Sequence, residues 1–330
     1  MTAILVAGLM WLLVASLLIL RRGRVERAIT WASLTIAIAM TLNIDAVYVE
    51  LDRLASGTNF VTLVADLALM TGVFLLGRGV MKAADEPPRA VRTALSRVTY
   101  VAAAAATAGT FFVIDRDATT TNFMIDFGAQ PAAMVYSMAL FTYYAVVLAA
   151  MATVAIRQVR VSRGILVAPP ILLIIGCAFG IALTVDVILM DLAHFAGRPE
   201  LMASAATPYS TLYLLTFVFL CGGFASQPAA RAFRARARAR ATQTLTRELA
   251  PIWHAASAVH PGISQRPDAA FDATDPEALL HRQVVEVRDA MIDTRVAFSI
   301  SDADRQVLER AERHLVGEDS KLPQRTRVTA

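Results

Sequence analysis

The sequence has few of the residues from which metal and redox sites are built. Its 330 residues include two cysteines and five histidines, and only 18% are charged. Because Cys177 and Cys221 both lie in apolar runs, we expect buried thiols and no disulfide framework. No cysteine or histidine pair has the spacing of metal ligands, so the sequence predicts no metal site and no cofactor.

The motifs that carry catalytic nucleophiles or phosphates are also absent. The chain has no GxSxG, HExxH, GxGxxG or phosphate-binding GxxxxGK[ST] sequence. His281 precedes Arg282, as at a histidine-kinase phosphoacceptor, but the residues after it are too few for an ATP-binding domain. The last apolar run has no lysine for a retinal Schiff base. We therefore expect a protein that is not an enzyme.

Apolar residues are abundant and make up 56% of the chain. They form seven runs, each near the ~20 residues that a helix needs to cross the hydrocarbon core of a bilayer. The expected fold is all-α: a seven-transmembrane-helix bundle over residues 1–224, in a multipass protein of a bacterial inner membrane. The runs cover residues 2–20, 28–44, 60–81, 98–114, 132–156, 165–190 and 207–224.

Arginine is concentrated on alternate connections between these runs. The segments 21–27, 78–97, 157–163 and 231–240 hold three to five basic residues each, and the other connections hold one each. Because basic residues in short loops are retained in the cytoplasm, we expect the N-terminus outside and the C-terminus inside. Arginines spread over several loops do not indicate nucleic-acid binding.

Five acidic or polar residues lie in or beside the apolar runs, near the predicted outer face. An ionisable side chain is costly to bury in a bilayer, so such residues usually face the bundle interior, a cavity or a partner. The sequence is compatible with a cation or cationic-ligand site that opens to the exterior. The alternative is that these residues lie at the interface or hydrogen-bond neighbouring helices. They are Asn43, Asp45, Asp66, Asp186 and Asp191.

Two glycines in the sixth run, Gly176 and Gly180, form a GxxxG pattern. Small residues at this spacing allow helix backbones to approach closely in membranes. We therefore expect helix contacts there rather than a ligand site.

Residues 225–330 are polar and predict a small helical cytoplasmic domain. Arg231, Arg234 and Arg238 share one helix face by their i, i+3, i+7 spacing. Such a face attracts anionic lipid headgroups, although a plain stop-transfer flank would have the same composition. Because a domain of this size is only marginally stable alone, we expect it to pack on the bundle, on a second copy as a homodimer, or on a cytoplasmic regulatory protein.

Three helices are expected in this tail. Pro251 should interrupt the first, and residues 256–276 should form a loop. The second helix, over 277–296, has an apolar seam, and we expect its polar side to be a solvated, salt-bridged face rather than an acid–base site. The third begins with a capping box at Ser301 and ends at Gly317.

The segments LTRELAPIWHAASAVHPGI and LLHRQVVEVRDAMI carry a family resemblance. They are similar to the C-terminal domain of actinobacterial seven-helix membrane proteins that are catalogued by name as transporters, although the domain has no assigned function. Ala290 stands where that family usually has glycine. The resemblance implies a domain motif of Leu249, Pro251, Trp253, Arg282, Glu286, Arg288 and Asp289.

Two functions of different class fit these patterns. In the first, the protein is a membrane sensor or signalling scaffold that passes an external or intramembrane signal to its cytoplasmic domain. In the second, it is a transporter-like carrier of a small cationic solute that uses Asp66 and Asp186. An odd number of helices and the lack of a visible inverted repeat count against the carrier.

Overall fold

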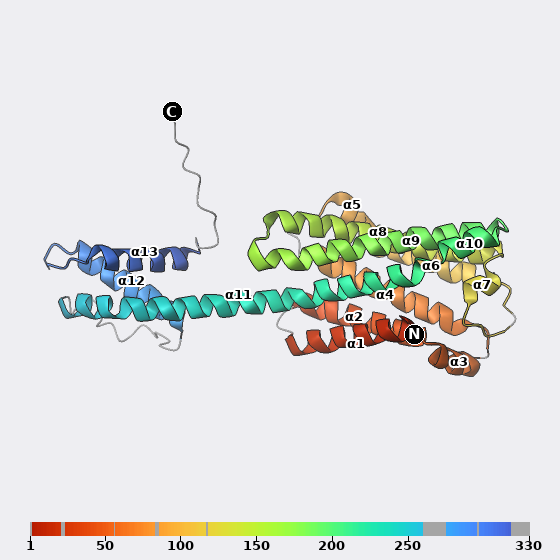
Figure 1. Cartoon of the computed structure of the whole chain (residues 1–330), viewed down its shortest axis with the longest axis horizontal. Helices are drawn as coiled ribbons and strands as arrows, with labels where there is room; N and C mark the ends of the chain where they lie inside the picture. The colour runs from red at the N-terminus through yellow and green to blue at the C-terminus, as the bar shows by residue number, and fades with distance from the viewer. Residues whose placement is uncertain are drawn as a thin grey trace, which may run out of the picture. The chain divides into compact units, whose positions relative to one another are not determined.

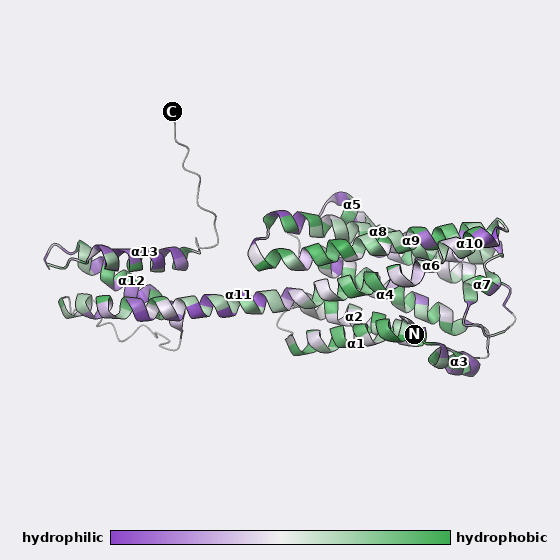
Figure 2. Cartoon of the chain, in the orientation of Figure 1, coloured by the Kyte–Doolittle hydropathy of each residue, from purple (hydrophilic) through white to green (hydrophobic). Residues whose placement is uncertain are grey.

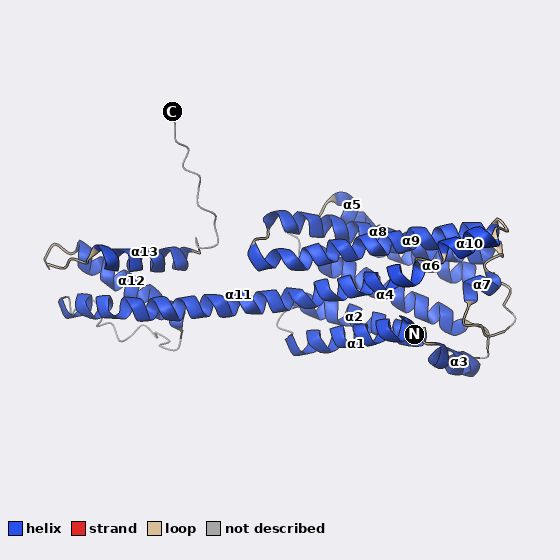
Figure 3. Ribbon diagram, in the orientation of Figure 1, coloured by secondary structure: helices blue, strands red, loops and turns tan. Residues whose placement is uncertain are grey.

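The computed structural model describes residues 2–20, 24–55, 57–82, 86–116, 118–259, 275–295 and 297–317, without the side chains of residues 20 and 24–27. Within these ranges the chain forms helices and no strand (Figure 3). It divides into two compact units, Met1–Ala230 and Arg231–Ala330. Helix α11, Tyr209–Val259, contributes to both.

The N-terminal unit is a bundle of long helices with shorter ones between them (Figure 1). The short helices α3, α7 and α10 lie at the end of the bundle where α1 begins (Figure 1). The helices before α11 are α1 Thr2–Leu20, α2 Arg24–Leu42, α3 Asp45–Leu54, α4 Phe60–Lys82, α5 Arg89–Ala94, α6 Arg97–Phe111, α7 Phe123–Phe127, α8 Pro131–Val161, η1 Gly164–Val167, α9 Ala168–Phe195 and α10 Pro199–Ala205.

Five helical segments in the described part of the chain are long and apolar enough to cross a membrane, and a bent pair makes a sixth. Figure 2 shows green along most of α1, α8 and α9, whereas α11 turns from green to purple towards its C-terminal end. The run predicted over 98–114 forms α6, whose 15 residues rise only ~22 Å at 1.5 Å per residue. The five segments are Thr2–Ile19, Phe60–Lys82, Pro131–Val161, Gly164–Phe195 and Pro199–Val259, and the bent pair is Ala28–Leu42 with Asp45–Leu54.

The bend lies between α2 and α3, which meet at 84°. The sequence indicated a plain connection after residue 44, whereas the structure has the amphipathic helix α3 there. Tyr48 and Asp52 are its buried side chains. Asp45 in its first turn and Arg53 in its last suit the helix dipole, which favours acids at the start and bases at the end.

Glycines allow the long helices to pack closely. A Cβ atom at Gly176 of α9 would lie 2.8 Å from the backbone nitrogen of Leu220 in α11. A Cβ atom at Gly180 would lie 2.7 Å from Leu148 of α8 and 3.1 Å from Thr216 of α11. The predicted helix contact at the GxxxG pattern is therefore confirmed.

We expect Gly176→Ala to lower the free energy of unfolding by about 1–3 kcal/mol, because overpacking forces backbones apart. The measurement is the thermal unfolding midpoint of the full chain in detergent. Gly222→Ala is the matched control, since a Cβ there would meet only Leu172 Cδ1, at 3.8 Å. Equal midpoints for the two variants would contradict close packing of α9 on α11.

The C-terminal unit consists of the last part of α11 with α12, Pro276–Ile292, and α13, Asp302–Val316. Its core has fully buried leucines from all three helices, Leu249, Leu280 and Leu308. The predicted caps of the third helix are confirmed: Ser301 Oγ accepts a hydrogen bond from Asp304 N at 3.2 Å, and Gly317 adopts φ +76°.

The prediction of a break at Pro251 is wrong. Helix α11 continues through this exposed proline to Val259. Proline costs ~3 kcal/mol inside a helix, because it lacks an N–H and its ring crowds the preceding turn. Burial of Ile252 and Ala256 in the core, directly after the proline, offsets that cost. Most of the loop predicted over 256–276 falls on residues 260–274, outside the described residues.

Candidate functional site

The N-terminal unit contains a cavity of about 370 Å³ lined by α1, α2, α4, α8, α9 and α11. Its volume is at the lower end of the ~300–1,000 Å³ of small-molecule pockets. Apolar lining residues include Met10, Leu13, Leu69, Val73, Leu76, Met151, Leu220 and Phe224, and polar ones include Asn43, Asp66, Tyr144, Thr184, Tyr209, Ser210 and Tyr213.

The cavity is elongated, with a polar end and an apolar end. Its lining extends from Tyr209 to Phe224 along α11, which is ~22 Å at 1.5 Å per residue. Along α4 it extends from Asp66 to Leu76, ~15 Å. Tyr209 begins α11, Asp66 lies early in α4 and Asn43 directly follows α2. The polar groups therefore gather at the end of the bundle where α1 begins.

Asp66 is the only charged side chain among the described residues that line the cavity. Tyr136 of α8 donates a hydrogen bond to its Oδ2 atom, and the Tyr144 hydroxyl lies 3.5 Å from its backbone oxygen. Within the described part of the chain, Oδ1 accepts no hydrogen bond. The carboxylate is thus half-buried, held by one tyrosine, and has an oxygen available to a positively charged group.

Aromatic rings surround the polar end. Tyr209 stacks on Tyr213 with ring centroids 5.9 Å apart, and Tyr213 meets Phe217 edge-on at 5.1 Å. Phe141 meets Tyr144 edge-on at 5.7 Å. All five residues line the cavity. Since the faces of such rings attract cations, they complement Asp66.

The structure divides the five predicted outer residues. Asn43 and Asp66 line the cavity. Asp186 and Asp191 are buried in α9, 8% and 5% exposed, but do not line it. Asp45 is exposed in the first turn of α3. The cavity thus combines two of the five residues with Tyr144, Tyr209 and Tyr213.

Sequence reasoning missed a buried polar cluster at the same end of the unit. Asp52 is 0% exposed and accepts hydrogen bonds from Asn59 N at 3.0 Å, Val61 N at 3.3 Å and Thr119 Oγ1 at 2.7 Å. Tyr48 Oη donates to Asn59 Oδ1 at 2.8 Å. Asn59 has φ +58°, a conformation that asparagine tolerates better than most residues. The cluster ties the α3–α4 turn to the loop after α6.

The motif residues of the C-terminal domain hold its helices together. Glu286 of α12 is 7% exposed and accepts hydrogen bonds from Trp253 Nε1 of α11 and from Arg282 Nε, the latter at 2.7 Å. The predicted solvated face is therefore wrong for Glu286, although the predicted salt bridge is present. Leu249 is fully buried in the core, whereas Pro251 is exposed.

Two further motif residues lie nearby on α12. Arg288 makes a bidentate ion pair with Glu312 of α13, with Nε–Oε1 at 2.6 Å and Nη2–Oε2 at 2.9 Å. This hydrogen bonding raises the pKa of the Arg288 guanidinium above its usual value. Asp289 is exposed. Most of the motif thus acts in helix packing.

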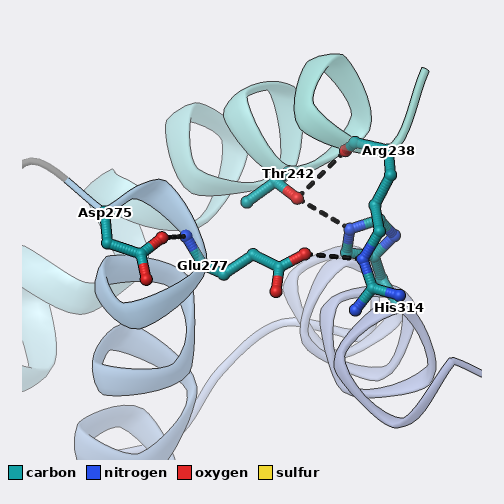
Figure 4. A network of polar contacts seen from close by, with 5 residues as sticks. All are labelled: Arg238, Thr242, Asp275, Glu277 and His314. Atoms are coloured by element: carbon teal, nitrogen blue, oxygen red, sulfur yellow. Dashed lines mark hydrogen bonds and ion pairs between the residues drawn. The ribbon is translucent and has the colours of Figure 1, made fainter. Parts of the chain in front are cut away.

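A polar network joins α11 to both other helices of this unit (Figure 4). Thr242 Oγ1 donates to the Arg238 carbonyl at 3.0 Å and lies 2.8 Å from Nε2 of His314 in α13. Arg238 also forms an ion pair with Glu277 of α12. Asp275 caps α12 by accepting a hydrogen bond from Glu277 N at 3.0 Å. Arg238, one of the three predicted lipid-facing arginines, is therefore engaged within the domain.

Among the described residues, no group of three or more His, Cys, Asp or Glu side chains could hold a metal ion. Cys177 and Cys221 are free and buried. No curated protein and no solved structure matches the chain. Residues 234–330 match a family of unknown function, DUF6545, and this confirms the predicted C-terminal domain of unknown function.

Proposed function

We propose that this chain is a multipass protein of a bacterial inner membrane that binds a small ligand in the cavity and passes the change to its C-terminal domain. In this proposal seven helices cross the bilayer, with the N-terminus outside and residues 234–330 in the cytoplasm. The alternation of arginine along the connections supports this orientation. The crossing helices would be α1, α2, α4, α6, α8, α9 and α11.

One observation carries the proposal: α11 contributes to both the cavity and the C-terminal core. Its residues from Tyr209 to Phe224 include eight that line the cavity. Further along, Leu245, Leu249 and Ile252 of the same helix pack in the core with α12 and α13. Because a helix transmits rotation and displacement along its hydrogen-bonded backbone, a ligand that shifts its first part acts on the second.

The two cysteines allow a test that does not depend on the natural ligand. Cys221 lines the cavity, whereas Cys177 does not. In a Cys177→Ala background, the Cys221 thiolate would form a mixed disulfide with benzyl methanethiosulfonate, release methanesulfinate and so place a benzylthio group in the cavity. Because Cys221 is 4% exposed, intact mass first establishes that it has reacted. We expect this modification to change amide hydrogen exchange in α12 and α13, measured by mass spectrometry on the full chain in nanodiscs.

Cys177→Ala/Cys221→Ser, treated in the same way, is the control and should show unchanged exchange. Val73→Phe fills the cavity without a reagent, since Val73 also lines it. If α12 and α13 exchange at the same rate in the modified protein, in Val73→Phe and in the untreated chain, occupancy of the cavity does not reach the C-terminal domain.

A second candidate function is a carrier of a small cationic solute, which the position of Asp66 in the cavity favours. Uptake of tetraethylammonium into proteoliposomes measures it. A carrier would lose uptake in Asp66→Asn and keep it in Asp45→Asn, because Asp45 is exposed and is not among the residues that line the cavity. A carrier that also uses Asp186 should lose uptake in Asp186→Asn as well.

The first turns of α11 beyond the bundle offer a contact with lipid. Arg231 and Arg234 are exposed, and we propose that they lie against anionic headgroups. Arg238 instead forms an ion pair with Glu277. The C-terminal domain would in addition bind a cytoplasmic regulatory protein or a second copy of itself. A pull-down with the full chain as bait identifies which.

A further inference from the structure

We infer that the occupant of the cavity is a single-chain amphiphile with a positively charged head group, of the chemical class of a long-chain alkylammonium ion. Its head would lie at Asp66 and its chain would extend along α4 and α11. This inference rests on the cavity being the ligand site of the proposed function, and it adds the chemical class of the ligand.

The sign of the head group follows from the charged side chains that face the cavity. Among the described residues, Asp66 is the only charged one that lines the cavity, and no arginine, lysine or histidine of these ranges does so. Its Oδ2 atom accepts a hydrogen bond from Tyr136, whereas Oδ1 accepts none from the described residues. An anionic head would meet a carboxylate with no compensating cation. An ammonium group would donate a charge-assisted hydrogen bond to Oδ1.

The rings at the polar end suit the same head group. Tyr209 and Tyr213 of α11 form a stacked pair, and Tyr144 of α8 also lines the cavity. The Tyr213 hydroxyl already donates to Met40 Sδ at 2.9 Å, so this ring presents no free hydroxyl donor to the head group. Cations bind to such faces within about 6 Å of the centroid.

The length of the tail follows from the shape of the rest of the cavity. Beyond Asp66 the lining on α4 is Leu69, Val73 and Leu76, which recur at helical spacing on one face. On α11 it continues to Phe224, ~22 Å from Tyr209. At this depth the Thr216 hydroxyl is already hydrogen-bonded within its own helix: Oγ1 donates to the Leu212 carbonyl at 2.7 Å. An extended hydrocarbon chain fits this space, whereas a small hydrated ion leaves it empty.

The test uses the full chain in phosphatidylcholine nanodiscs with radiolabelled decylammonium, and empty nanodiscs correct for partitioning into lipid. Decanol and decanoate, with the same chain and a neutral or negative head, serve as competitors. We expect decylammonium to bind about tenfold or more tightly than decanol, because a hydrogen bond to a charged group distinguishes them. Decanoate should compete least.

Two substitutions separate the head from the tail. Asp66→Asn should remove the preference for decylammonium and keep decanol binding, which also shows that the cavity is intact. Asp66→Glu should retain the preference, and Asp45→Asn, outside the cavity, should change nothing. Val73→Phe should weaken decylammonium and decanol alike, because it shortens the space for the chain.

Three results would overturn the inference. Equal affinities for decylammonium and decanol in the wild-type chain would indicate a plain lipid-chain pocket. A preference that survives in Asp66→Asn would place the cation elsewhere. Undiminished decylammonium binding in Val73→Phe would indicate a site for the ammonium group alone, with the hydrocarbon chain outside the cavity. Binding as expected, with unchanged exchange in α12 and α13, would instead refute only the coupling to the C-terminal domain.

Discussion

Replacing Glu286 with alanine is expected to unfold the contact between α11 and α12 in the C-terminal domain. The change leaves the Trp253 indole N–H and the Arg282 guanidinium without the carboxylate that pairs them. The pair is only partly buried, with side chains 33% and 9% exposed, and each of the two lost hydrogen bonds to a charged group costs about 1.5–3 kcal/mol. A domain of this size has little stability to lose. Amide exchange across α12, in the full chain, should accelerate by at least about a hundredfold.

Glu277→Ala on the same helix is the matched control. Its ion pair with Arg238 is about half exposed on both sides, and such pairs contribute only about 0–1 kcal/mol. Glu286→Gln should lie between the two, because the amide keeps one acceptor oxygen for the indole but loses the charge and the second acceptor. If Glu286→Ala and Glu277→Ala accelerate exchange equally, the hydrogen bonds of Glu286 do not stabilise the domain.

Asp52→Ala is expected to destabilise the end of the bundle where α1 begins, by about 3 kcal/mol or more. The residue has no exposed surface, and its loss leaves the donors Asn59 N, Val61 N and Thr119 Oγ1 without their acceptor. Each unsatisfied buried donor costs about 1–3 kcal/mol. The measurement is the thermal unfolding midpoint of the detergent-solubilised chain, together with exchange in α3.

The control is Glu50→Ala in the same helix. Among the described residues, Glu50 forms its ion pair with Arg53 alone, and both side chains are more than 70% exposed. The free energy of unfolding should therefore change by less than about 1 kcal/mol. An Asp52→Ala variant as stable as Glu50→Ala would show that the three donors find other acceptors.

Glu286 and Asp52 have structural roles that differ from those their sequence context indicates. Glu286 belongs to the family-like motif and was a formal acid–base candidate, yet its hydrogen bonds join helices. Asp52 lies in a connection between two apolar runs of the sequence, yet it is buried. The residues whose chemistry is still available to a ligand are those of the cavity, with Asp66 first among them.

Local features were predictable because neighbouring residues determine them. The run 2–20 became α1, Thr2–Leu20, and the run 60–81 became α4, Phe60–Lys82, since a continuous apolar stretch of this length is typical of a membrane-length helix. The third helix of the tail has the predicted Ser301 cap and Gly317 stop for the same reason. Pro251 was mispredicted because its effect depends on the core around it.

The amino-acid sequence by itself determined that this protein is helical, rich in membrane-length apolar segments, and ends in a polar helical domain. Tertiary structure alone decided which polar residues meet. Tyr136 reaches Asp66 across 70 positions, and Thr119 reaches Asp52 across 67. Hydropathy is a property of each segment, whereas a hydrogen bond between distant segments depends on how helices pack and rotate, which no local pattern encodes. The cavity forms only when these helices pack together.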